Sequence, residues 1–170
     1  MKKINKEDIQ IRHAEPGDYE ALQEIYKQPN AFAGTLQLPF PSMEMWRRRL
    51  AEPPEGTYNL VAVVDGKVVG QLGLQTSPRP RRRHVGSFGI GVHDDWQGRG
   101  IGKALLKACV EMADNWLNLT RLELEVYTDN EAAVGLYKSY GFEIEGTKRQ
   151  DAFRDGRYVD SYFMARLRTY

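Results

Sequence analysis

A glycine-rich turn in front of an apolar, periodic segment is the part of this sequence best suited to chemistry. The first N–H groups of a helix have no partner within the helix and lie at the positive end of its dipole, so they can bind phosphate oxygens. Arg99 and Lys103 add positive charge beside the turn, and Gln97 adds an amide donor. We therefore expect an anion-binding site formed by Gln97, Gly98, Arg99, Gly100, Ile101, Gly102 and Lys103.

The spacing of these glycines narrows the choice of ligand. The chain contains neither the G-x-x-x-x-G-K-[ST] pattern of nucleotide-hydrolysing enzymes nor the G-x-G-x-x-G pattern of dinucleotide-binding domains. It contains Q-x-x-G-x-G over residues 97–102 and N-x-x-A-x-x-x-Y-x-x-x-G-F over residues 130–142. These two patterns, in this order, resemble the signatures of the GNAT superfamily of acyl-CoA-dependent N-acetyltransferases. Residues 11–14, 35–37 and 79–82 extend the resemblance over nearly the whole chain, to the bacterial YhhY type of amino-acid acyltransferases.

The resemblance implies acetyl-CoA as the co-substrate and no metal. Its pyrophosphate would lie in the glycine-rich turn, and its pantetheine arm would follow the strand expected over residues 84–92. The backbone of Ile90 and Val92 would bond that arm, and the N–H of Val92, or one nearby, would polarise the thioester carbonyl. Asn130 would hold the arm while capping its own helix. Tyr137 matches the family's general acid, and a phenol pKa near 10 is close enough to a thiol's, about 8.5, for proton transfer.

Glu125 is our candidate for the general base. It lies on an expected strand and faces away from Leu124 and Val126. The amine's proton could instead leave through water, and a solvated or ion-paired role is the more ordinary interpretation of such a residue. Cys109 lies on the apolar face of its helix, where a thiol is buried and inert. We therefore expect direct attack within a ternary complex and no acyl-enzyme.

The loop over residues 34–41 is the expected acceptor site, because this fold usually admits the acceptor there. We expect Thr35, Leu38 and Phe40 to line the substrate pocket, although simple packing is an equal alternative. Together with the resemblance, the apolar residues Leu36, Leu38, Phe40 and Trp46 around this loop favour a small primary amine as the acceptor, and in particular a free hydrophobic amino acid. The alternatives are a protein N-terminus or lysine, a polyamine or antibiotic, and a non-catalytic acyl-CoA sensor. Residues 79–83 predict a solvated arginine-rich tip or, less readily, a site for an acidic group.

The composition excludes several other classes of function. The 170 residues carry 24 Lys and Arg against 23 Asp and Glu, so bulk positive charge does not provide nucleic-acid binding. Neither an apolar run of 18 residues nor a signal peptide is present, which predicts a cytoplasmic protein without membrane contact. The single cysteine excludes an intrachain disulfide and a cysteine zinc site, and His13 and His84 lack metal-ligand spacing. The resemblance also suggests a homodimer, which is common in that family.

The order of the elements must bring these residues together. Apolar periodicity predicts one strand, two helices, three strands, a helix, a strand, a helix and two final strands. This order indicates an α/β-type, three-layer single domain over residues 1–170. The resemblance implies a GNAT-like mixed, mostly antiparallel sheet of about seven strands with helices on both faces. The glycines of the 84–92 strand predict a bulge or a close approach by another group.

Overall fold

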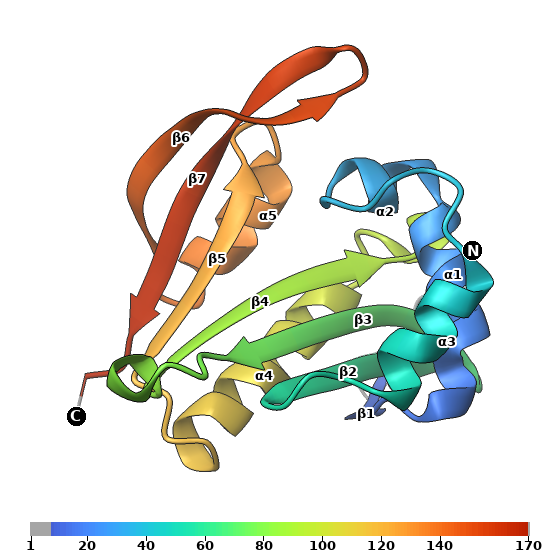
Figure 1. Cartoon of the computed structure of the whole chain (residues 1–170), viewed down its shortest axis with the longest axis horizontal. Helices are drawn as coiled ribbons and strands as arrows, with labels where there is room; N and C mark the ends of the chain where they lie inside the picture. Colours follow the sequence, from blue (N-terminus) through green and yellow to red (C-terminus); the bar gives the residue numbers. More distant parts are fainter. Residues whose placement is uncertain (1–7, 170) are drawn as a thin grey trace.

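The computed structural model describes residues 8–169, and its central feature is a seven-stranded sheet (Figure 1). The strands are β1 (Gln10–His13), β2 (Thr57–Val64), β3 (Lys67–Thr76), β4 (Val85–Val92), β5 (Arg121–Tyr127), β6 (Glu143–Arg154) and β7 (Arg157–Leu167). The helices are α1 (Tyr19–Lys27), α2 (Pro29–Ala33), α3 (Met43–Ala51), α4 (Ile101–Asn115) and α5 (Glu131–Lys138), with short 3₁₀ turns at Pro16–Asp18, Pro80–Arg82 and Asp94–Trp96. The strand order is β1-β2-β3-β4-β5-β7-β6, and every neighbouring pair is antiparallel except β4 and β5.

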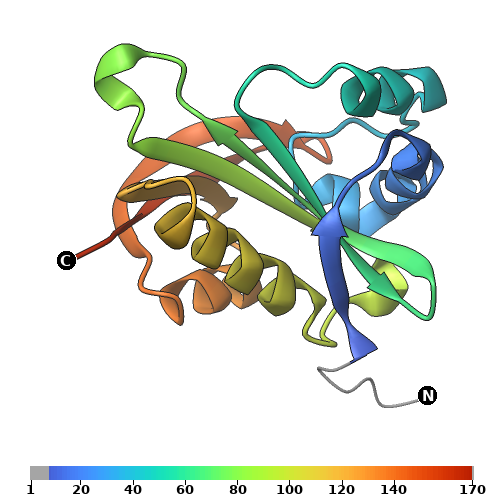
Figure 2. The same cartoon turned by 90° about the horizontal axis from the view of Figure 1, so that it is seen from below.

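Helices cover both faces of this sheet, as predicted. Figure 2 shows α4 and α5 on one side, and α1 and α3 on the other. Because side chains alternate along a strand, β2 supplies both layers: Leu60 and Ala62 belong to the core under α4, whereas Val61 and Val63 pack with α1 and α3. The mixed, mostly antiparallel three-layer architecture is therefore confirmed.

The parallel pair in the sheet is also its shortest. β4 and β5 are in register only from Val85, opposite Arg121, to Ser87, opposite Glu123. Beyond Ser87 the two strands diverge, and Figure 1 shows the V-shaped opening between them. The rest of β4 keeps its partner β3 on the other side, without a register shift. The sheet thus splits near its middle, between β4 and β5.

The glycines of β4 mark close approaches, and the alternative of a bulge in β4 is wrong. A Cβ on Gly91 would lie 2.6 Å from the ring of Tyr26, and one on Gly86 would lie 2.8 Å from Leu119. Both distances are too short for real Cβ contacts. Gly89 instead faces open space, because no described residue other than its chain neighbours lies within 4 Å of the position that its Cβ would take. Glycine is therefore needed for close packing at residues 86 and 91, and it leaves a hollow at residue 89.

The predicted order of strands is confirmed, and one short helix is an addition to the predicted elements. Helix α2 has only five residues, and its N-terminus is capped from a distant part of the chain. The carboxylate of Asp94 accepts hydrogen bonds from the N–H groups of Asn30 (3.0 Å) and Ala31 (3.1 Å). A cap 64 residues away leaves no local signal in the sequence. Separately, no helix among residues 8–169 is long and apolar enough to cross a membrane.

Candidate active site

A cavity of about 1380 Å³ opens where β4 and β5 diverge. Residues from both strands line it, together with the glycine-rich turn before α4, the start of α5, and the loop after α2. Most of the predicted site residues line this one space: Thr35, Ile90, Val92, Gln97, Gly98, Gly100, Ile101, Gly102, Lys103, Glu125, Asn130 and Tyr137. The fold therefore joins the predicted cofactor and acceptor regions into one cavity.

The backbone of β4 offers hydrogen-bond donors along one side of the opening. The N–H of His93 donates to the carbonyl of Val69, 2.9 Å away on the β3 side. In an antiparallel strand the N–H groups alternate in direction, so those of Ile90 and Val92 point to the other side. At that point β5 has already diverged, and these two N–H groups have no strand partner among residues 8–169. They are free to bind a ligand lying between the strands.

The glycine-rich turn keeps the first turn of α4 accessible. Gly98 (φ 70°) and Gly100 (φ 86°) adopt left-handed conformations that favour glycine, and Gly100 is the N-cap of α4. Apart from the adjacent residues, no part of the chain over residues 8–169 lies within 4 Å of a Cβ position on either glycine. A Cβ on Gly102 would make only ordinary contacts, at 3.6 Å from Leu136 and 4.0 Å from Val92. The N-terminus of this 15-residue helix is thus open to an anion.

Two side chains of the turn differ from their predicted use. The guanidinium of Arg99 stacks on the Trp96 ring at 5.2 Å and does not line the cavity. The amide nitrogen of Gln97 donates to the carbonyl of Val92 (3.1 Å) and to Asp94 Oδ1 (3.2 Å). Because its donors are engaged, Gln97 holds the turn against the end of β4 instead of offering its amide to an anion. The donor role predicted for the Gln97 amide is corrected accordingly, whereas the positive charge that Arg99 adds beside the turn stays a prediction.

Tyr137 lies at the inner end of the opening, on α5. Its side chain is 8% exposed and meets Phe88 and Phe142 edge to face, each at 5.9 Å between ring centres. Burial raises the pKa of Tyr137 to about 12, since a phenolate is poorly solvated there. No group within residues 8–169 hydrogen-bonds its hydroxyl. Asn130 begins the same helix, and its Oδ1 accepts from the N–H of Ala133 at 3.2 Å.

Glu125 lines the cavity from β5, and so do the flanking residues Leu124 and Val126, which also belong to the core. Its carboxylate forms an ion pair with Lys148 of β6, and the hydrogen bond raises the pKa of that lysine. The Lys148 ammonium also lies 5.7 Å from the centre of the Phe163 ring. Glu125 is therefore in reach of the cavity but already paired.

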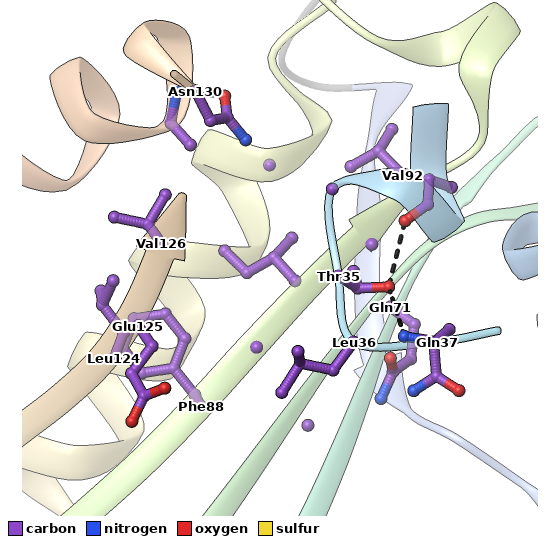
Figure 3. A pocket seen from close by; sticks show the side chains of 18 of the residues that line it. Thr35, Leu36, Gln37, Gln71, Phe88, Val92, Leu124, Glu125, Val126 and Asn130 are labelled. Carbon is purple, nitrogen blue, oxygen red and sulfur yellow. Dashed lines mark hydrogen bonds between the residues drawn. The ribbon is translucent and has the colours of Figure 1, made fainter. Parts of the chain in front are cut away.

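The acceptor loop lines the cavity with other residues than predicted, and Thr35 is the one predicted residue among them. Thr35 and Leu36 line it, and Figure 3 shows both beside Gln37 and Gln71. The Thr35 hydroxyl accepts from the N–H of Gln37 at 3.2 Å, and the Thr35 carbonyl accepts from the Tyr127 hydroxyl at 3.0 Å. The second bond links the loop to β5 and so places a roof across the cavity.

The prediction that Leu38 and Phe40 line the pocket is wrong. They are 80% and 95% exposed, and neither lines the cavity. Phe40 has a left-handed backbone (φ 60°) between Pro39 and Pro41, and its side chain lies in solvent.

A polar floor under the acceptor loop is a further part of the site, which the sequence motifs did not indicate. The Tyr26 hydroxyl donates to Gln71 Oε1 at 2.5 Å, and Gln71 Nε2 donates to Asn59 Oδ1 at 3.0 Å. Gln71 and Gln75 alternate with the buried Leu72 and Leu74 along β3. That alternation of polar and apolar residues is a readable signal for a strand with one face on a cavity.

Comparison with known proteins identifies the class. Residues 19–142 match the family described as Acetyltransferase (GNAT) family. The chain therefore belongs to the GNAT family of acetyltransferases, and it is an acetyl-CoA-dependent N-acetyltransferase.

Individual relatives define its place within the family. The chain is 52% identical over 161 residues to the L-amino acid N-acetyltransferase AaaT of Escherichia coli (strain K12), covering 95% of this chain and 99% of that one. It is 35% identical over 121 residues to the N-alpha-acetyltransferase RimI of Mycobacterium tuberculosis (strain ATCC 25618 / H37Rv), covering 71% and 72%. A GNAT superfamily phosphinothricin acetyltransferase (Pat) from Sinorhizobium meliloti, solved in complex with AcCoA, has a TM-score of 0.82 and 26% identity, covering 94% of this chain and 88% of that one.

Proposed function

We propose that this enzyme acetylates the α-amine of a free L-amino acid. The observation that carries the proposal is the 52% identity, over nearly the whole of both chains, to a relative named as an L-amino acid N-acetyltransferase. The roof formed by the bond between Tyr127 and Thr35 supports it, because a bridged cavity favours a small acceptor over a folded protein. The polar floor around Gln71 and Asn59 suits an acceptor that carries hydrogen-bonding groups near its amine.

The residues around the opening fit acetyl-CoA. The free N–H groups of Ile90 and Val92 would bond the pantetheine arm, and Asn130 would hold it from the α5 side. The open N-terminus of α4, at Gly98, Gly100, Ile101 and Gly102, would bind the pyrophosphate with help from Lys103. When bound, acetyl-CoA supplies a thioester whose acetyl carbon is attacked by the acceptor amine, so that a C–N bond forms and the C–S bond breaks.

The chain's own groups would manage the charges and protons of this step. The N–H of Val92 or Ile90 would stabilise the negative charge that develops on the carbonyl oxygen. Glu125, released from Lys148, or a water molecule would accept the proton that the amine loses. Tyr137 would hold a proton at Oη for the departing sulfur.

The raised pKa of Tyr137 widens the pKa gap between the phenol that donates the proton and the thiolate that accepts it. Against a thiol pKa of about 8.5, a phenol at about 12 gives up its proton unfavourably. A thiolate formed in the same apolar corner would also be poorly solvated, which raises the thiol pKa and narrows the gap.

Cys109, the only cysteine of the sequence, is not a suitable nucleophile for a covalent acyl-enzyme. Cys109 is fully buried in the core under α4, and burial raises the pKa of its thiol to about 12. It does not line the cavity. These observations support direct attack within a ternary complex.

Several finer expectations belong to the same proposal. We propose a hydrophobic amino acid as the preferred acceptor, since Leu36, Trp46 and Phe163 line the cavity beside its polar floor. Four further properties stay predictions: that the enzyme needs no metal, that it is a single domain, that it is cytoplasmic and that it forms a homodimer. Cell fractionation tests the location, and light scattering of the purified chain tests the oligomeric state.

One assay tests the acceptor. Acetyl-CoA-dependent thiol release is measured with free L-amino acids, spermidine and a peptide with a free N-terminus. We expect a hydrophobic L-amino acid to give the highest kcat/KM. Faster turnover of the peptide or of spermidine would refute the amino-acid acceptor. Cofactor binding without thiol release for any amine would instead indicate a non-catalytic sensor.

A further inference from the structure

The cavity contains a cation that the reaction described above does not use. Among the described residues that line it, Lys103 and Arg49 are the basic ones. Lys103 belongs to the first turn of α4, beside the expected pyrophosphate site. Arg49 lies on α3, in the acceptor part of the cavity with the polar residues Asn59 and Gln71. It is therefore the cation available to an acceptor.

Arg49 differs from its two neighbours on the same helix. Arg47 and Arg48 both form ion pairs with Glu44, at 2.7 and 2.9 Å. Within residues 8–169, Arg49 is paired with no carboxylate; its Nη1 donates to the amide oxygen of Gln37 at 3.1 Å. A guanidinium has five N–H donors, so this one bond leaves donors free. Gln37 also lines the cavity, which keeps the guanidinium at its edge.

Stacked rings fix Arg49 relative to the reacting strand. Its guanidinium lies 4.9 Å from the centre of the Trp46 ring, and Trp46 stacks on Tyr26 at 4.7 Å and 6°. The Tyr26 ring in turn packs against Gly91, between the two residues whose N–H groups are free. A continuous stack thus connects the guanidinium to the strand where the thioester is expected.

The acidic residues of the cavity lie on its opposite side. Glu123 and Glu125 come from β5, and Asp151 comes from β6. Figure 3 shows Glu125 on one side of the pocket and Gln37, the hydrogen-bond partner of Arg49, on the other. The carboxylates of the cavity thus lie toward the β5 side, where Glu125 is paired with Lys148 and Glu123 with Arg82 and Arg121, and the Arg49 guanidinium lies toward α3. An amino acid has the complementary arrangement of an amine and a carboxylate on one carbon.

We propose that Arg49 binds the α-carboxylate of the acceptor and so selects free amino acids over other amines. This inference rests on the proposed function and identifies the group that gives it specificity. The planar fork of a guanidinium matches a carboxylate in bidentate geometry. The carboxylate held at Arg49 leaves the amine directed along the floor toward β4 and Glu125. A neutral amide or ester of the same amino acid lacks the charge that Arg49 recognises.

The test compares one amino acid with its own amide. Wild-type, Arg49→Met, Arg49→Lys and the control Arg48→Met are assayed for kcat/KM with L-methionine and L-methioninamide, each with saturating acetyl-CoA. Arg48 is adjacent, exposed and outside the cavity lining, so its replacement controls for loss of charge on α3. Acetyl-CoA affinity is measured for each variant by calorimetry.

We expect Arg49→Met to lower kcat/KM for L-methionine about 10- to 100-fold, the usual cost of losing charge-assisted hydrogen bonds. The amide should change by less than about 3-fold, and Arg49→Lys should restore part of the activity toward the acid only. Arg48→Met should leave both substrates unchanged. Equal losses for acid and amide, an unchanged ratio in Arg49→Met, or a loss of acetyl-CoA affinity would overturn the assignment of Arg49. If the wild-type enzyme acetylates neither compound but does acetylate a peptide, the proposed function itself fails.

Discussion

Replacing Tyr137 by Phe isolates proton delivery from packing. The Tyr137 ring packs edge to face on Phe88 and Phe142, and Phe retains these contacts. The hydroxyl has no hydrogen-bond partner within residues 8–169, so removing it leaves no buried group unsatisfied. We therefore expect the melting temperature of Tyr137→Phe to lie within about 3 °C of wild type, which corresponds to less than about 1 kcal/mol for a chain of this size.

The kinetic effect of this substitution can be bounded from the pKa. A positioned general acid contributes about 10² to 10⁴-fold. With Tyr137 at about 12 and a thiol near 8.5, the transfer is uphill by about 3.5 pKa units, or about 5 kcal/mol, before the thiolate's own desolvation is counted. An acid this weak is used inefficiently, so we expect the lower part of the range, a fall in kcat of about 10² to 10³-fold.

The pH dependence of kcat is an independent test of the raised pKa of Tyr137. Burial disfavours the phenolate, so Tyr137 keeps its proton until the pH approaches 12. Wild-type kcat should accordingly show no loss on the alkaline side between about pH 8 and 10. Loss of activity in that window that disappears in Tyr137→Phe would show that the acid ionises well below 12, against this reasoning.

Stopped-flow or steady-state thiol release gives kcat, and calorimetry gives the acetyl-CoA affinity. Tyr140→Phe is the matched control, because Tyr140 follows the same helix and does not line the cavity. A kcat within about 3-fold of wild type, with any loss confined to cofactor affinity, would make Tyr137 a packing residue.

Three further outcomes follow from the geometry. Gly102→Asp should abolish acetyl-CoA binding in a folded protein, because its Cβ has room but its charge faces the anion site, whereas Gly135→Asp on α5 should leave calorimetric affinity intact. Asp94→Ala removes the cap of α2 and should lower stability by about 0.5 to 2 kcal/mol, a fall of about 2 to 6 °C in differential scanning fluorimetry; an unchanged melting temperature would contradict this. Leu36→Ala should reduce kcat/KM for hydrophobic amino acids, and Phe40→Ala should not; the reverse order would restore Phe40 to the pocket.

The elements that the sequence predicts well are those with local causes. The hairpin between β2 and β3 turns at Asp65 and Gly66, which both have positive φ, as such a pair predicts. Asn130 caps α5 as expected, because its side chain bonds a backbone N–H three residues later. Signals of this kind lie within a few residues of the structure they produce, so a single sequence suffices to read them.

The features that escaped prediction depend on distant contacts. The pairing of β4 with β5 ends after Ser87, and no turn or proline signal in the sequence near Ser87 marks that point. The position of Gln97 in the turn favours an anion-binding role, but Asp94 and the Val92 carbonyl engage its amide in the folded chain. The apolar side chain of Leu38 suits a pocket, yet the outward course of the loop decides its exposure. Residue type indicates what a side chain can do, and tertiary contacts decide which of those uses is available.

Strand β4 explains why the acetyl group should be transferred at this point of the fold. Its side chains at Phe88, Ile90 and Val92 pack with the core under α4, which anchors the strand. On the opposite face Gly89 leaves a hollow in the acceptor cavity, and Gly91 gives room to the Tyr26 ring. In the plane of the sheet, the N–H groups of Ile90 and Val92 point into the gap left by β5. One strand thus presents three different surfaces: an apolar anchor, a hollow for the amine and donors for the thioester. A thioester that bonds to these N–H groups lies beside β4 in the plane of the sheet, and an amine in the hollow at Gly89 lies on the face of β4. The two therefore meet along the free edge of β4, and Tyr137 of α5 and Glu125 of β5 line the cavity at that edge.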